Sequence, residues 1–190
     1  MARGDQQKLA EYRSKRDLRR SGEPSGSTRK SRGKPRFVVQ RHAASSLHFD
    51  FRLEIDDVLV SWAVPKGPST DPRDKRLATR TEDHPLDYVD FEGRIQEGEY
   101  GAGTVVVWDR GTYENLREED VADGLEHGHL TVWLNGEKTR GGYALTHAHL
   151  RGDDRNWLLV KVDDAEADRR RKPARTQPES VLSGRTNEEL

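Results

Sequence analysis

The 190-residue chain contains no cysteine, which excludes both a disulfide framework and a thiolate metal site. It has no long apolar run either, whereas a membrane-spanning helix needs about 20 consecutive apolar residues. The opening residues, MARGDQQKLAEY, lack the apolar core of a signal peptide. These absences predict a soluble, cytoplasmic protein with no membrane partner.

Apolar residues are also scarce, at 32% against 35% charged residues, and they concentrate between Phe37 and Val162. Such a composition is lean for a wholly globular chain, so we expect only the apolar part to fold by itself. The predicted organisation is one domain over residues 37–164, with an N-terminal arm over 1–36 and a charged C-terminal tail over 165–190. We expect this tail to be flexible or draped over the domain.

The net charge of −1 conceals an asymmetry between the arm and the domain. Residues 1–36 carry 12 Lys or Arg against four acids, whereas residues 37–150 carry 12 basic and 21 acidic residues. A basic arm on an acidic body indicates a polyanionic partner, although a solubilising disordered tail has the same composition. Within the arm we predict a short helix over 5–19 and a linker over 24–35.

The stretch FVVQRHAASSLHFDFRLEI, residues 37–55, carries the clearest structural pattern. From Leu47 to Ile55 apolar and polar residues alternate strictly, which is typical of a β-strand with two different faces. The β-branched and aromatic residues 37–42 predict a partner strand. The four residues AASS between them fit a hairpin loop.

This hairpin predicts a metal site. If His42 and His48 are cross-strand partners on one face, their Cβ atoms lie about 4.5–5.5 Å apart, and Gln40 lies opposite Asp50. Two imidazoles and a carboxylate then form a three-ligand site with open positions, and Arg52 would contact an anion bound there. The alternative is the solvated face of an amphipathic strand, but an exposed face has no reason to carry two histidines.

The rest of the domain reads as short strands joined by Gly and Pro turns. We expect strands over 58–64, 77–81, 105–108, 130–134, 143–149 and 157–162, a turn at 109–112, and a helix over 117–126. The predicted fold is all-β dominated, a compact antiparallel β-barrel with one or two short helices and the basic arm. In a barrel the polar face of residues 47–55 could point inward and enclose the metal. We expect a monomer.

A family resemblance rests on three segments in this order: RHAASSLHFDFRLE, WAVPKGPS and TEDHPLDYVDFEGRIQEGEYGAGTVVVWDRGTYE. They resemble the 3′-phosphoesterase domain of bacterial DNA ligase D and its free-standing relatives, and the similarity extends from KRDLRRSGEPSG to SVLSGRT. The resemblance implies a DNA-end-healing hydrolase that acts as phosphodiesterase and phosphomonoesterase. It would remove a 3′-terminal ribonucleoside from a primer strand and hydrolyse the resulting 3′-phosphate to a 3′-hydroxyl.

The resemblance also implies partners and site residues. The partners are DNA or RNA–DNA 3′ ends, together with the ligase, polymerase and Ku components of end joining at the nucleoid. One divalent ion, manganese, would be held by His42, His48 and Asp50. The residues that match the family's catalytic positions are Gln40, Arg52, Lys66, Arg76, Glu82, His84 and Tyr88. Those that match a segment folded over the active site are Arg16, Asp17 and Glu23.

Within this set, Arg52 and His84 would meet the scissile phosphate, with Tyr88 nearby. His84 could act as general acid or as a charged phosphate donor, because histidine changes charge near neutral pH. Both a free-standing protein and a domain of a larger ligase fit the sequence.

Four further histidines depart from the family pattern or stand apart from it. We interpret His127, His129, His147 and His149 as structural or surface residues. An alternative function would use one of the last two of these histidines. The two-histidine, one-carboxylate triad of non-haem Fe(II) oxygenases would be resembled by His48 and Asp50 together with His147 or His149. A second alternative, a nucleic-acid-binding module without chemistry, leaves the convergence of histidines and aspartate unexplained.

Overall fold

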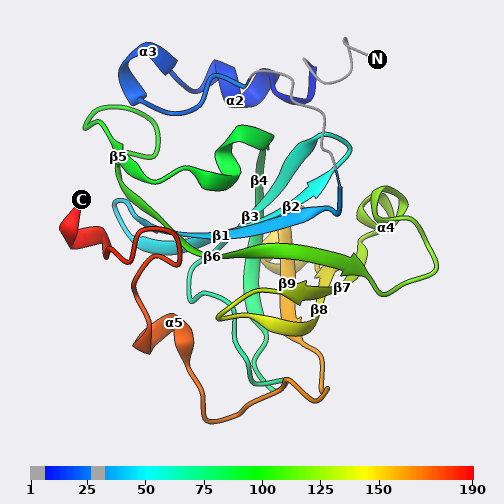
Figure 1. Ribbon diagram of the computed structural model, residues 1–190. Helices are drawn as coiled ribbons and strands as arrows, with labels where there is room; N and C mark the ends of the chain where they lie inside the picture. Colours follow the sequence, from blue (N-terminus) through cyan, green and yellow to red (C-terminus); the bar gives the residue numbers. More distant parts are fainter. Residues whose placement is uncertain (1–6, 27–32) are drawn as a thin grey trace.

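The computed structural model describes residues 7–26 and 33–190 of the chain, and strands predominate in it (Figure 1). Eight strands form a closed antiparallel barrel in the order β1-β2-β3-β4-β9-β8-β7-β6, and pairing of β6 with β1 closes it. The short β5 pairs with β6 beside this ring. The predicted all-β barrel is therefore confirmed. The strands are β1 (Arg36–Ala43), β2 (Leu47–Ile55), β3 (Val58–Val64), β4 (Arg76–Pro85), β5 (Gly93–Ile95), β6 (Gly103–Asn115), β7 (His129–Asn135), β8 (Arg140–His147) and β9 (Asn156–Lys161).

The helices of the described residues are short. The α-helices are α2 (Ala10–Ser14), α3 (Leu18–Ser21), α4 (Val121–His127) and α5 (Pro173–Thr176), and the 3₁₀ helices are η1 (Leu86–Asp90), η2 (Leu150–Gly152) and η3 (Asn187–Glu189). Across the two described ranges, none of them has both the length and the apolar character that crossing a membrane requires.

The barrel interior is a packed apolar core. Phe49 and Phe51 on β2 are almost fully buried. They belong to a cluster that also contains side chains from each of the remaining strands of the ring. Edge-to-face aromatic pairs link strands that are not hydrogen-bonded neighbours, such as Phe49 on β2 with Trp108 on β6 at 5.2 Å and Trp62 on β3 with Trp157 on β9 at 5.6 Å between ring centroids. The alternation of β2 is therefore explained by one face that fills the barrel.

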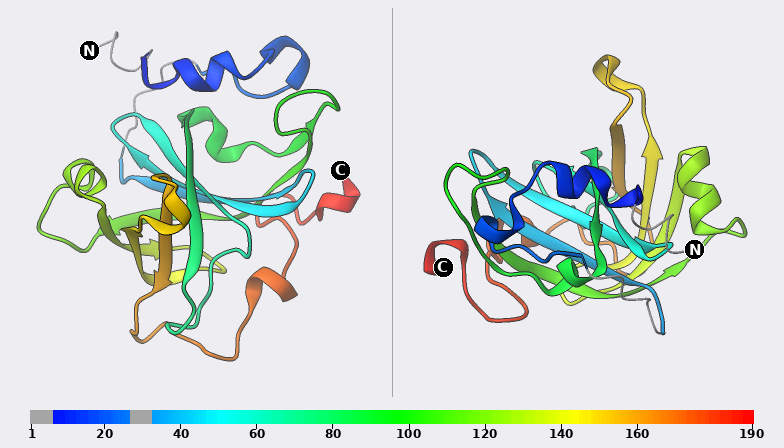
Figure 2. Two further views of the ribbon diagram at one scale, coloured as in Figure 1. Left: turned by 180° about the vertical axis from the view of Figure 1, so that it is seen from behind. Right: turned by 90° about the horizontal axis from the view of Figure 1, so that it is seen from above.

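The polar face of β2 points outward, so the prediction that it lines the barrel interior was wrong. The apolar cluster described above occupies the barrel interior instead. The outward face is covered instead by η1 and by the arm, and Figure 2 shows α2 and α3 lying across the strands. A second apolar cluster supports this cover. Its members are Tyr12, Val38, Leu59, Leu86, Tyr88, Val89 and Val107.

The arm forms two short helices where the sequence predicted one over 5–19. The Asp17 carboxylate accepts a hydrogen bond from the Arg19 backbone N–H at 3.2 Å and so caps α3, which breaks the helix just before it. Residues 1–6 and 27–32, parts of the predicted helix and linker, lie outside the described residues.

The predicted turn at 109–112 was wrong, because β6 runs through it to Asn115. Gly111 serves close strand packing there: a Cβ at this position would lie 2.1 Å from the Asn135 carbonyl oxygen. Asp109 is buried and accepts the Thr139 backbone N–H at 2.7 Å, which holds the β7–β8 loop. Other predicted boundaries moved as well: β4 continues to Pro85, β6 begins at Gly103, β8 spans Arg140–His147, and α4 begins at Val121.

The C-terminal segment is draped over the barrel. The Trp108 indole N–H donates to the Gln177 carbonyl at 2.6 Å, and the Val181 N–H donates to the Val107 carbonyl at 2.9 Å. Near the end, the Asn187 side-chain amide donates to the Thr104 carbonyl at 2.8 Å. Of the two predicted alternatives, a flexible tail or one draped over the domain, these bonds favour the second.

Candidate active site

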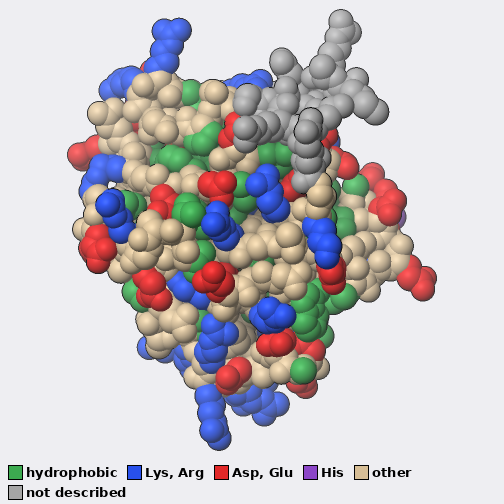
Figure 3. Space-filling view, viewed as in Figure 1, with side chains coloured by type: hydrophobic (Ala, Val, Ile, Leu, Met, Phe, Trp, Pro, Cys, Tyr) green, Lys and Arg blue, Asp and Glu red, His purple; other side chains and the backbone are tan. Residues whose placement is uncertain are grey.

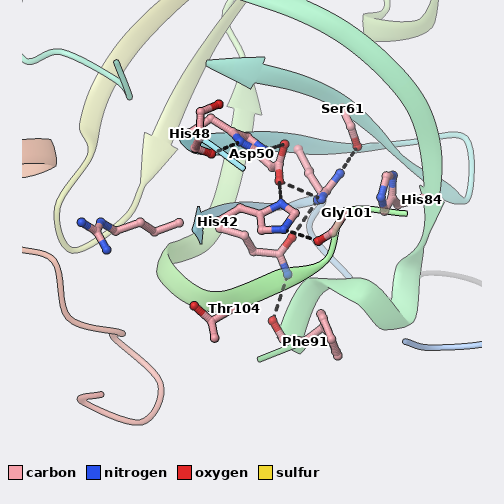
Figure 4. A network of polar contacts seen from close by, with 12 residues as sticks. His42, His48, Asp50, Ser61, His84, Phe91, Gly101 and Thr104 are labelled. Atoms are coloured by element: carbon pink, nitrogen blue, oxygen red, sulfur yellow. Dashed lines mark hydrogen bonds and ion pairs between the residues drawn. The ribbon is translucent and has the colours of Figure 1, made fainter. Parts of the chain in front are cut away.

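The hairpin of β1 and β2 brings the predicted metal ligands together. Its register pairs His42 with His48 and Gln40 with Asp50, as the sequence predicted. One ligand atom from each of His42, His48 and Asp50 lies within 4.8 Å of the other two, and Figure 4 shows the three side chains converging. Among the described residues, this is the one group of three such side chains.

The hydrogen bonds of both histidines suit metal ligands. His42 Nε2–H donates to the Gly101 carbonyl at 2.7 Å, and His48 Nδ1–H donates to the Ser46 carbonyl at 3.3 Å. Their other nitrogens, His42 Nδ1 and His48 Nε2, lie 3.4 and 3.3 Å from the Asp50 carboxylate oxygens. Metal-binding histidines are typically oriented in this way, through a bond from the ring nitrogen that faces away from the ion.

The electrostatics favour an ionised Asp50. Burial would raise the pKa of its carboxyl, but Arg52, His42 and His48 outweigh burial and hold this pKa well below the usual range. Burial lowers the pKa of His48, while the bond to Asp50 more than offsets it, so the net pKa is raised. A cation is thus favoured between these groups, and a metal ion can replace the proton.

Arg52 is held rigidly beside the ligand trio. Its Nε donates to Gln40 Oε1 at 2.7 Å, Nη1 donates to Ser61 Oγ at 2.9 Å, and Nη2 lies 3.5 Å from Asp50. Gln40 is fixed in turn by a bond to the Tyr88 carbonyl at 2.9 Å. Sequence reasoning missed Ser61, although a lone hydroxyl in the apolar strand VLVSWAV was a usable signal.

His84 is neutral in this arrangement. Its Nδ1–H donates to the Glu82 carbonyl at 2.9 Å, so Nε2 accepts the hydrogen bond from Arg16 Nη2 at 3.3 Å. Burial first, then the charges of Arg52 and Arg16, hold the pKa of His84 well below its usual value. The expectation that its charge changes near neutral pH therefore does not apply to this state of the protein.

The arm places charged groups over the site. Arg16 donates from Nε to Glu23 at 3.0 Å and from Nη1 to Glu82 at 3.0 Å, and it is almost fully buried. Lys15 Nζ bonds the second Glu82 oxygen at 3.2 Å, and the Tyr88 hydroxyl donates to Glu23 at 2.7 Å. The arm and the barrel are thus joined by buried ion pairs at the site itself.

These side chains enclose a pocket of about 350 Å³. Besides the metal trio, its lining includes Arg16, Arg52, Glu82, His84, Tyr88, Tyr100 and Gly101. Sequence reasoning missed Tyr100, whose ring lies 5.2 Å from the Arg16 guanidinium. It lies in the glycine-bearing stretch 95–104, whose sequence superficially resembles a phosphate-binding loop but favours a tight turn, because no Lys-Ser/Thr and no helix start follow it.

Three predicted site residues lie elsewhere. Asp17 caps α3, as described above, and is not part of the pocket lining. Lys66 and Arg76 line a different pocket, which is formed with the C-terminal segment.

The distal histidines are also apart from the trio. His147 Nε2–H donates to the Asp154 carbonyl, its ring stacks on Trp157, and His149 Nδ1 lies 3.3 Å from the Asp154 carboxylate.

Comparison with known proteins gives a consistent result. Residues 40–147 match the DNA Ligase D 3′-phosphoesterase domain. The chain is 54% identical over 182 residues to the multifunctional non-homologous end joining protein LigD of Pseudomonas aeruginosa, covering 94% of this chain and 21% of that protein. The protein of the same name from Mycolicibacterium smegmatis is 44% identical over 162 residues, 83% of this chain and 21% of its own length.

The multifunctional non-homologous end joining DNA repair protein LigD of Mycobacterium tuberculosis is 44% identical over 156 residues, 82% of this chain and 20% of that protein. The chain therefore spans about one fifth of the length of these curated relatives.

Proposed function

The chain belongs to the DNA ligase D 3′-phosphoesterase domain family, and on that premise we propose that it is a metal-dependent hydrolase of nucleic-acid 3′ ends in DNA repair. It removes a 3′-terminal ribonucleoside from a primer strand and then hydrolyses the remaining 3′-phosphate to a 3′-hydroxyl. The observation that carries this proposal is the ligand trio beside a rigid, buried arginine in one pocket.

The metal is one manganese ion, held by His42 Nδ1, His48 Nε2 and an Asp50 oxygen. A mixed set of imidazole and carboxylate donors, without sulfur, suits divalent first-row metals, and the family favours manganese among them. A bound ion of this kind polarises a phosphoryl oxygen and lowers the pKa of a bound water.

Arg52 and Arg16 neutralise the phosphate. Both guanidiniums are buried, so their charge-assisted hydrogen bonds to non-bridging oxygens are strong. Arg52 is already oriented by Gln40 and Ser61, so it needs no reorganisation as charge develops in the transition state.

His84 handles the proton. A phosphate bound against Arg16 and Arg52 offsets the two cations that depress the His84 pKa, so binding raises this pKa. The Arg16 hydrogen bond moves from His84 Nε2 to the phosphate, Nε2 gains a proton, and it donates this proton to the leaving oxygen.

The oxygenase alternative finds less support. Its triad needs His147 or His149 beside His48 and Asp50, whereas His42 completes the trio here. Two buried arginines in the same pocket also suit a phosphate better than molecular oxygen. As partners we propose primer–template 3′ ends and, within end joining, ligase, polymerase and Ku components.

The test is a primer–template with one 3′-terminal ribonucleotide, incubated with manganese or with a chelator. We expect a 3′-phosphate product followed by a 3′-hydroxyl product with manganese, and neither product with chelator. Activity that persists in chelator, or no product in manganese, would contradict the proposed function.

A further inference from the structure

A second pocket, of about 470 Å³, lies between the loop after β3 and the C-terminal segment. We call it the basic pocket. Its lining carries six cations against two carboxylates, in a chain of net charge −1. The cations are Lys66, Arg76, Arg169, Arg171, Lys172 and Arg175, and the carboxylates are Asp71 and Asp74.

The two carboxylates are already engaged. Asp71 pairs with Arg73 at 2.9 Å, and Asp74 lies 3.5 Å from Arg76 and accepts the Ser69 hydroxyl at 2.7 Å. The other five cations of the basic pocket have no carboxylate within 4.0 Å in the described part of the chain. Most cations near the active-site pocket are paired, so this excess of positive charge is a local feature.

The fold holds these cations in place. Thr70 is buried, and its hydroxyl bonds the carbonyl oxygens of Asp168 and Arg171, each at 2.8 Å. Gly67, with φ of +74°, lets the C-terminal segment approach closely: a Cβ there would lie 2.9 Å from Ala174 Cβ. The cluster is thus built by specific packing and does not arise from a loose tail.

One donor in the basic pocket is unsatisfied. Arg76 Nε is buried and has no hydrogen-bond partner within residues 7–26 and 33–190. Buried polar groups are nearly always paired, so an unpaired N–H in a cluster of cations indicates an anionic ligand.

The basic pocket and the active-site pocket lie on the two sides of the first residues of β2. Leu47 and Phe49 line the basic pocket, whereas His48 between them lines the active-site pocket. Successive side chains of a strand point to opposite faces, so the two pockets lie on opposite faces of this end of β2. In Figure 3, Lys and Arg side chains stand at the lower end of the molecule, which in Figure 1 is formed by the loops below α5.

We propose that the basic pocket binds phosphodiester groups of the primer strand whose 3′ end occupies the active-site pocket. This inference rests on the proposed function. The departing nucleoside carries no phosphate beyond the scissile one, whereas the retained strand carries one per nucleotide. A cluster of unpaired cations next to the metal ligands therefore fits the retained strand, and it fixes the direction in which that strand leaves the site.

The test measures binding of a fluorescein-labelled DNA primer–template with a 3′-phosphate, in chelator so that no hydrolysis occurs. The variant combines Arg171→Gln, Lys172→Gln and Arg175→Gln. The control combines Arg110→Gln, Arg117→Gln and Arg140→Gln, which removes the same charge from exposed sites elsewhere. Each phosphate contact contributes about 0.7–0.9 to the slope of log affinity against log salt, so we expect the variant's slope to fall by about two to three.

At about 0.1 M salt, we therefore expect the variant to bind the primer–template on the order of a hundredfold more weakly than the wild type does, whereas the control should bind it with nearly wild-type affinity. Equal slopes for variant and control would overturn the inference, as would equal binding of polyglutamate and primer–template by the wild-type protein. Because binding is measured without catalysis, it is independent of the hydrolysis assay. An absence of manganese-dependent hydrolysis would refute the proposed function while the binding result stands.

Discussion

The two faces of strand β2 are both buried, but they are buried by different means. The inner face is covered by the other strands of the barrel, and it needs only apolar side chains of suitable volume. The outer face is covered by the arm and η1, and almost every polar atom on it has a named partner. Burial on the inner face stabilises the fold, whereas burial on the outer face fixes charges in a low-dielectric setting. The inner residues are Phe49, Phe51 and Leu53, and the outer ones His48, Asp50 and Arg52.

The largest loss of metal binding and activity is expected from a substitution on the outer face, at Asp50. Asp50→Asn keeps the volume and removes the anionic ligand, so we expect manganese affinity to fall by more than the roughly 10–100-fold typical of residues that only orient metal ligands. Both hydrolytic activities should fall to the level seen in chelator. Calorimetric titration with manganese and single-turnover rates measure the two effects.

The matched control is His147→Ala, since His147 lies outside the trio and contacts Asp154. This variant should bind manganese and hydrolyse both substrates like the wild type. The opposite pattern, with His147 essential and Asp50 dispensable, would favour the oxygenase alternative.

The second effect concerns the anion contact at Arg52. Arg52→Met keeps most of the volume but removes a fixed cation, and loss of one such preorganised donor costs about 10²–10³ in rate. Because the proposed mechanism has Arg52 contact the non-bridging oxygens in both steps, diester cleavage and monoester hydrolysis should slow alike. Arg110→Met, on the surface, serves as control. A loss confined to one of the two steps would remove Arg52 from the shared phosphate contact.

Much of this site could be predicted from the hairpin alone. Strict alternation from Leu47 to Ile55 and a four-residue loop determine which side chains share a face, so His42, His48 and Asp50 were predicted correctly as neighbours. Alternation does not say which face fills the barrel. That depends on closure between β1 and β6, a contact between distant segments, and for this reason the inward orientation was predicted wrongly.

The contacts of the arm were beyond pattern reasoning for a similar reason. Arg16, Glu23 and Glu82 meet through buried ion pairs that span up to 66 residues of sequence, and no periodicity reports such pairs. Family resemblance identified these positions without their geometry. Gly111 misled the prediction in β6, because a glycine needed for close strand packing resembles a turn glycine in sequence.

The third effect is a pH dependence at His84. Its pKa is depressed below about 6.5 in the free protein by burial and by Arg52 and Arg16, and phosphate binding offsets the two cations. If the protonated form donates to the leaving oxygen, activity falls as pH rises through the relevant pKa. For kcat/KM, which reports the free enzyme, this fall lies below about pH 6.5, and for kcat, which reports the complex, it lies at higher pH.

Steady-state kinetics of diester cleavage from pH 5 to 9 would measure both profiles, and His84→Asn should abolish the fall in each. Besides Arg16 and Arg52, the ionisable groups near His84 are Tyr12, Tyr88 and Asp50. Burial raises the pKa of both tyrosines above this range, and the pKa of Asp50 is held well below its usual value. Coincident falls in kcat and kcat/KM, or a fall that survives His84→Asn, would contradict the proton transfer from His84.

The smallest effect on activity is expected on the inner face, at Phe51. Its ring is fully buried and lies 6.3 Å from the Trp62 ring, with no polar contact to the site. Phe51→Leu leaves a small cavity, and such losses of buried volume cost about 1–3 kcal/mol in the free energy of unfolding. Because the neighbouring Asp50 and Arg52 are held by bonds on the opposite face, rates per folded molecule should change less than about threefold, within the effect of ordinary repacking.

Urea unfolding and single-turnover rates on the same preparation would separate these two quantities for Phe51→Leu. Arg52→Met, one residue away, should show the reverse pattern, a large loss of rate. If Phe51→Leu instead lowers the rate as strongly as Arg52→Met, the core must set the positions of the outer side chains through the strand backbone. If Phe51→Leu lowers only the stability and Arg52→Met lowers the rate, the hydrogen bonds to Gln40 and Ser61 suffice to place Arg52. The core can then be repacked without loss of activity.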